Sequence, residues 1–174
     1  MSGITVAEKK LLKRIDNEDL RLSAESIRQV IARLWSNEAP RIVKDFTDHG
    51  IGHSERLANL VVKLIDANDG RHISSKEIYL LLLGIYLHDI GMQCDIVKFP
   101  EIKNFAEQFG AKLDHEFVSK TSSGYEAGEQ KYIRINHQFL SAAWIHYSYL
   151  TGDTILPRFP LTHNEPGNAY FYIP

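Results

Sequence analysis

Three residues of this chain have side chains that suit a divalent cation, namely His53, His88 and Asp89. His53 lies one turn before Leu57, where an apolar helical pattern begins, so its imidazole is expected on the buried side of that helix. His88 and Asp89 directly follow a long apolar segment, and Gly91 is expected to end the helix there. A buried carboxylate beside imidazoles is costly unless something compensates its charge. One or two divalent ions would do so, and this mixed nitrogen and oxygen set does not distinguish Mn, Fe, Zn, Mg or Ni. The alternative is a hydrogen-bonded core trio without metal.

Two short segments carry a more specific pattern. Asp48–Leu57 (DHGIGHSERL) has a histidine at an expected helix start, and 34 residues separate His53 from the His-Asp pair of Leu87–Gly91 (LHDIG). Over about residues 45–150 this combination resembles the HD-domain superfamily. The resemblance implies an all-helical, metal-dependent phosphohydrolase whose substrate is a nucleotide or another phosphorylated small molecule. The segment before His53 also resembles a subgroup with a helical extension that occurs in multidomain bacterial proteins.

The resemblance also implies roles for individual residues. His53, His88 and Asp89 match the metal ligands, and Asp89 would bridge two ions where two bind. His137 is the candidate for a second metal position or a phosphate contact, and His49 for an acid or a phosphate contact. The distal aspartate ligand of the family has no clear counterpart. Asp153 either substitutes for it, or the ligand lies beyond Pro174 in a longer parent protein.

Helical patterns account for most of the chain and predict an all-α bundle over residues 1–150, which the resemblance implies is of the HD type, with an irregular extension over residues 151–174. The extension is proline-rich and aromatic, which suggests a chain cut from a longer protein. We expect Ser119–Gly124 to form a surface loop. The predicted helices cover Val6 to Asn17, Ser23 to Pro40, His53 to Asn68, Ser74 to Gly91, Ile102 to Phe109, and Asn136 onward. The third carries the apolar stripe Leu57, Leu60, Val61, Leu64 and Ile65, and the fourth begins with a capping box formed by Ser74 and Glu77.

The composition narrows the function classes. The chain has 174 residues, with 20 basic and 22 acidic side chains, so bulk charge does not indicate nucleic-acid or membrane-surface binding. The single cysteine, Cys94, fits a reducing compartment, and no segment reads as a membrane span. We therefore expect a cytoplasmic protein.

Three functional hypotheses follow from these observations. The first is the metal-dependent phosphohydrolase. The second is a metal-binding regulatory or sensor module with little activity of its own, joined to further domains of a larger protein. The third is a metal-free helical interaction domain. The remaining charged candidates are expected at the surface, namely Arg56, Lys63, His72, His115, His146 and His163.

Overall fold

The computed structural model describes residues 3–38, 50–68, 73–96, 99–112 and 127–151. These residues form helices and no strand, which confirms the all-α prediction. The predicted loop at Ser119–Gly124 and the extension after Thr151 lie outside the described residues. The elements are α1 (Val6–Leu12), α2 (Glu18–Glu38), α3 (Ile51–Ala67), α4 (Ser75–Leu87), the short 3-10 helix η1 (Ile90–Gln93), α5 (Pro100–Gln108) and α6 (Ala127–Thr151).

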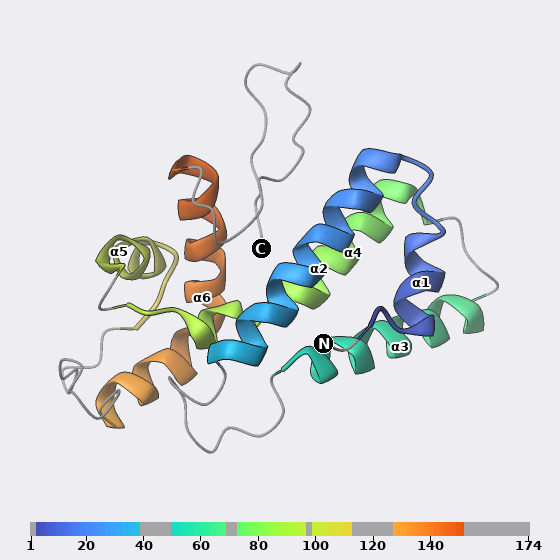
Figure 1. Cartoon of the computed structure of the whole chain (residues 1–174). Coiled ribbons are helices and arrows are strands. Elements are labelled where there is room, and N and C mark those ends of the chain that lie inside the picture. Colours follow the sequence, from blue (N-terminus) through green and yellow to red (C-terminus); the bar gives the residue numbers. More distant parts are fainter. Residues whose placement is uncertain (1–2, 39–49, 69–72, 97–98, 113–126, 152–174) are drawn as a thin grey trace.

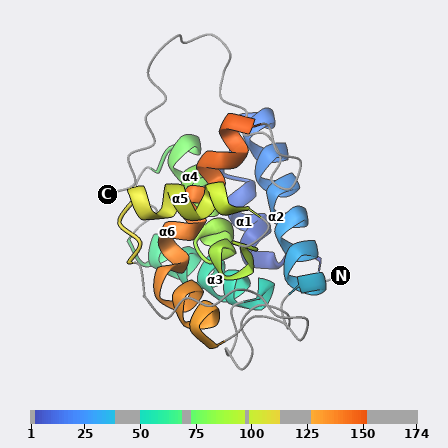
Figure 2. The ribbon, with the colours of Figure 1, turned by 90° about the vertical axis from the view of Figure 1, so that its left-hand side faces the viewer.

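Helices α1, α2 and α3 pack around α4, whereas α5 and η1 pack against α6. Helix α2 runs alongside α4, whereas α1 and α3 lie at one end of the molecule (Figure 1). At the other end α5 crosses α6, and η1 packs against α6 (Figures 1 and 2). None of the described helices is both long and apolar enough to cross a membrane.

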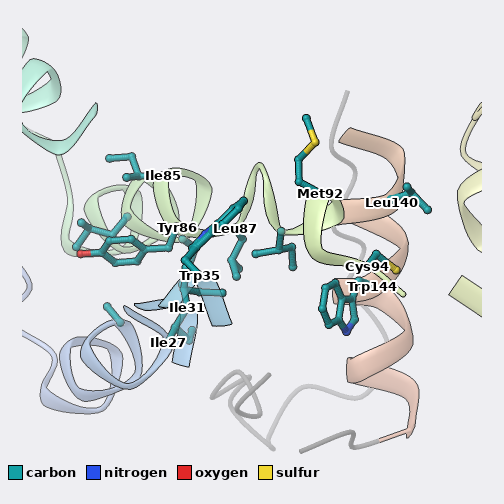
Figure 3. Packing of buried hydrophobic residues seen from close by; sticks show 14 of the residues in the cluster. Ile27, Ile31, Trp35, Ile85, Tyr86, Leu87, Met92, Cys94, Leu140 and Trp144 are labelled. Carbon is teal, nitrogen blue, oxygen red and sulfur yellow. The ribbon is translucent and has the colours of Figure 1, made fainter. Parts of the chain in front are cut away.

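The core joins two sets of side chains. Ile27, Ile31 and Trp35 of α2 pack beside Tyr86 and Leu87 of α4 (Figure 3). Further along the chain, Met92 and Cys94 pack beside Leu140 and Trp144 of α6 (Figure 3). All of these side chains are buried, so α2, α4, η1 and α6 share one apolar interior.

Helix α4 is less uniformly buried than its apolar sequence predicts. The capping box is confirmed, because the Ser74 hydroxyl accepts from the Glu77 amide while the Glu77 carboxylate accepts from the Ser74 amide. Ile78 and Leu82 are fully buried, but Leu80 and Leu81 are 48% and 40% exposed. The prediction of a helix buried on all sides was therefore wrong for this face.

Helix α3 forms as predicted, and its inward face overlaps the predicted stripe, since Ile65 is buried and Leu57 and Val61 pack against the core. Ser54, Ala58 and Ile65 are buried, whereas Leu60 and Leu64 are more than half exposed. The small side chain of Ser54 brings α3 close to α4, because its hydroxyl donates to the Ile85 carbonyl at 3.1 Å. The small residues Ser54 and Ala58 share the inward face with part of the predicted stripe, and Leu60 and Leu64 lie outside it.

Two helix starts were predicted too late. Helix α2 begins at Glu18 and not at Ser23, because the Asn17 side chain accepts from the Leu20 amide and caps the helix there. Helix α6 begins at Ala127, so Asn136 lies inside it. The predicted helices at Val6 and Ile102 are present, the first ending at Leu12 and the second beginning at Pro100.

Candidate metal centre

The structure brings His53, His88 and Asp89 together, although His53 lies on α3 and the other two lie after α4. One ligand atom of each lies within 4.8 Å of the others. Nε2 of His88 lies 2.9 Å from Oδ2 of Asp89, and Nε2 of His53 lies 3.9 Å from the same oxygen. The two imidazole ring centroids are 5.3 Å apart. The predicted convergence of the three side chains is therefore present.

Each of these residues lies at the end of an element. His53 is in the first turn of α3, where its amide donates to the Gly50 carbonyl at 2.9 Å. His88 is the C-cap of α4, which ends at Leu87 and not at Gly91 as predicted. Asp89 is the N-cap of η1, with φ −106° and ψ 3°. This backbone region is sparsely populated and common at active sites, and here it turns the carboxylate toward both histidines.

The ring of His88 is oriented by a backbone contact. Its Nδ1 lies 3.1 Å from the Ile85 carbonyl, which can only accept, so Nδ1 carries the proton and Nε2 faces Asp89. The same carbonyl accepts from the Ser54 hydroxyl, next to His53. One backbone oxygen therefore links the start of α3 to the ring of His88, as an outer contact does for a metal-binding imidazole.

The carboxylate of Asp89 is buried, so a nearby positive charge would stabilise it. Its side chain is 8% exposed, whereas the side chains of His53 and His88 are 30% and 38% exposed. The hydrogen bond with Asp89 raises the pKa of His88, against an opposing effect of burial. A proton on His88 is one way to neutralise the buried carboxylate, and a cation bound between Nε2 and Oδ2 is another.

His137 approaches the other oxygen of Asp89. Its Nε2 lies 3.5 Å from Oδ1, and its Nδ1 lies 2.8 Å from the Arg134 carbonyl, which fixes the ring in the same manner as that of His88. His137 lies well inside α6, and its side chain is 29% exposed. Asp89 therefore has histidines on both of its oxygens, His53 and His88 on one and His137 on the other.

Helix α6 is fixed to this site by Ser141, one turn after His137. The Ser141 hydroxyl accepts from the Gly91 amide at 2.9 Å and donates to the His88 carbonyl at 2.7 Å. A Cβ at Gly91 would lie 2.1 Å from the His137 carbonyl oxygen and 2.7 Å from the Ser141 nitrogen, so the close approach requires glycine. Sequence reasoning missed Ser141, and its position four residues after His137 was the available signal.

The other predicted site residues lie either outside the described residues or at the surface. His49 and Asp153 lie outside the described residues, as do His72, His115 and His163. His146 is exposed on α6, with the rings of Phe105 and Phe109 edge-on to it, and Arg56 and Lys63 are exposed on α3. Cys94 is fully buried, and burial raises the pKa of its thiol, so it is a core residue.

The residues fit a divalent ion. Ligands of an ion such as zinc bind at about 2 Å, and therefore lie within about 4 Å of one another. The three atoms need to close only slightly from their 4.8 Å spread. Imidazole nitrogens and a carboxylate oxygen are ordinary ligands of such ions.

The fold and the site together define an all-α protein with a histidine and aspartate cluster where α3, α4, η1 and α6 meet. The family model HD-CE matches residues 43–169, well over half of the chain, and the chain belongs to this family. No curated protein and no solved structure matches it. The match supports an HD-like domain, in agreement with the resemblance of His53, His88 and Asp89 to the HD pattern.

Proposed function

We propose that this protein is a metal-dependent phosphohydrolase of the HD type, acting on a nucleotide or another phosphate ester. The observation that carries the proposal is the arrangement around Asp89, with two histidines on one carboxylate oxygen and a third on the other. Membership of the HD-CE family supports it.

In this proposal His53, His88 and Asp89 would hold one divalent ion. His137 would help to hold a second ion or would contact the phosphate. When bound, such an ion would polarise a phosphoryl oxygen and make a water molecule more acidic. His49, outside the described residues, keeps its proposed role as an acid or a phosphate contact.

The chain's own residues orient the reaction. The contact of His88 with the Ile85 carbonyl and that of His137 with the Arg134 carbonyl direct both Nε2 atoms at Asp89. The buried carboxylate and the partly exposed imidazoles leave the histidine side of the site accessible to a substrate. We further propose a reducing, cytoplasmic setting, which the single cysteine favours.

The test is hydrolysis of bis-p-nitrophenyl phosphate and a nucleotide panel with added Mn²⁺. His88→Ala should lower kcat/KM by more than about a hundredfold, because losing a ligand exceeds the effect of losing an outer contact. His146→Ala is the matched control, since this exposed histidine of α6 packs near Phe105 away from Asp89. Activity that survives His88→Ala unchanged would contradict the assignment.

A second candidate is a metal-binding regulatory or sensor module of a larger multidomain protein. It is favoured because no aspartate follows His137 except Asp153, outside the described residues, so the distal ligand of the HD pattern is not accounted for. This function predicts stoichiometric metal in elemental analysis and no turnover on the same panel. Turnover that depends on His88 would reject it in favour of the hydrolase.

A further inference from the structure

A buried charge network joins the four helices at the end of the molecule where α3 lies. Nε of Arg28, on α2, lies 3.0 Å from Oε1 of Glu8, on α1. Nη2 of the same guanidinium lies 3.0 Å from Oε1 of Glu55, on α3. The Tyr86 hydroxyl of α4 donates to Glu8 at 3.0 Å, and Nη2 of Arg28 also donates to the Gly3 carbonyl.

This network is almost removed from water. The side chains of Arg28 and Glu8 are 4% and 0% exposed, whereas that of Glu55 is 23% exposed. Burying an ion pair offers little net stability over an apolar contact of the same size, so stability alone is a weak reason for such a network. A planar guanidinium that binds two carboxylates instead fixes their relative positions.

The network reaches the candidate metal centre through the start of α3. Glu55 follows His53 by two residues, so the two side chains leave α3 on opposite sides. The N-cap of this helix, Gly50, supplies no side-chain hydrogen bond. The contacts that secure the start of α3 include that of the Ser54 hydroxyl with the Ile85 carbonyl and that of the Glu55 carboxylate with Arg28.

We infer that Arg28 is a positioning residue for the candidate metal centre. Arg28 forms ion pairs with both Glu8 and Glu55, and through Glu55 it fixes the start of α3 and so the position of His53 relative to His88 and Asp89. The inference rests on the proposed function in taking the site to bind metal. Arg28 and Glu8 precede residues 43–169, so the positioning contacts come from helices that the family match does not cover. We expect the contact with Arg28 to affect His53 more than the other ligands, because His53 lies on the same helix as Glu55. Its Nε2 lies 3.9 Å from Oδ2 of Asp89.

The test compares Glu55→Ala with Glu55→Gln in the full 174-residue chain. The first removes the acceptor for Arg28, and the second keeps an oxygen that can accept from it. The matched control is Asp66→Asn, which removes a carboxylate paired with Lys10 at the opposite end of α3. Arg28→Lys is the second variant, since lysine keeps the charge and loses the fork.

Two measurements decide the outcome. Hydrogen exchange of the metal-free chain reports on the start of α3, and titration with Co²⁺ alone, followed by its visible absorption, reports on the ligands. Glu55→Ala should speed exchange at the start of α3 about tenfold with α6 unchanged, and weaken Co²⁺ binding about tenfold, as losses of outer contacts do. Glu55→Gln should restore part of both, and Asp66→Asn should change neither.

Unchanged exchange at the start of α3 in both Glu55→Ala and Arg28→Lys would overturn the inference, as would equal acceleration in α6, which marks global destabilisation. A wild-type chain that binds no Co²⁺ would overturn the inference and the proposed metal site together. Wild-type binding that Glu55→Ala leaves unchanged would overturn the inference alone.

Discussion

Gly91→Ala is expected to separate His137 from Asp89. The added Cβ would lie 2.1 Å from the His137 carbonyl oxygen and 2.7 Å from the Ser141 nitrogen, whereas ordinary contacts begin at 3.4 Å. Both atoms are backbone atoms of α6 and cannot rotate away. Since interiors are close-packed, η1 and α6 must move apart by about 1 Å. The 3.5 Å separation between Nε2 of His137 and Oδ1 of Asp89 would then exceed hydrogen-bonding distance.

The energetic cost has two parts. Overpacking a well-packed interior costs about 1–3 kcal/mol, and losing the hydrogen bond from Gly91 to Ser141 costs about 1 kcal/mol more. For a chain of this size a loss of about 3 kcal/mol lowers Tm by about 6–12 °C. Urea unfolding followed by circular dichroism measures the loss of free energy, and Co²⁺ titration measures the effect on the site.

Gly84→Ala is the matched control. Gly84 lies inside α4, and a Cβ there would meet nothing within 4 Å. Alanine should therefore stabilise the helix by about 0.5–1 kcal/mol through the lower entropy of its unfolded chain. The same substitution is thus expected to have opposite signs at the two glycines. Gly91→Ala with wild-type stability and unaltered Co²⁺ binding would refute the packing argument.

Three further outcomes are expected. Tyr86→Phe should lower the free energy of unfolding by about 1–2 kcal/mol in urea, because the buried Glu8 loses a donor. Burial raises the pKa of Glu8, but hydrogen bonds with Arg28 and other partners outweigh it, so the pKa lies below its usual value. The resulting stabilisation is present above the unfolded pKa of about 4.3 and is lost as pH falls through the lower folded pKa, a loss that acid titration of Glu8→Gln should not show. The hydrogen bond with Asp89 raises the pKa of His88, so the metal-free chain should lose this contribution to its stability as pH rises through the folded pKa. Co²⁺ affinity, measured over the same range, should fall with falling pH, because the proton on His88 competes with the ion.

The sequence predicted the central part of the site because its signals are local. A capping box at Ser74 and a His-Asp pair after an apolar helix can be recognised without knowing the fold. The sequence singled out His137 for a second metal position or a phosphate contact, and its Nε2 lies 3.5 Å from Oδ1 of Asp89, but the start of its helix was predicted too late.

The features that were missed depend on contacts between distant segments. Asn136 looked like a helix cap, but its amide holds the backbone of Lys112 and its own helix continues past it in both directions. The inward face of α3 was only partly predicted, because a hydrophobicity pattern gives no weight to the close approach of small residues such as Ser54. Arg28 has no sequence signal of its own, because its partners Glu8 and Glu55 lie on other helices.

The family match begins after α2, yet Ile27, Ile31 and Trp35 of that helix form part of the core. A fragment cut at residue 43 would expose the α4 surface that these side chains cover and would leave Glu55 without its guanidinium. The segment matched by the family model is therefore smaller than the set of helices that builds the apolar core. A transfer of this domain into another protein should include the first two helices, because they cover the apolar surface of α4.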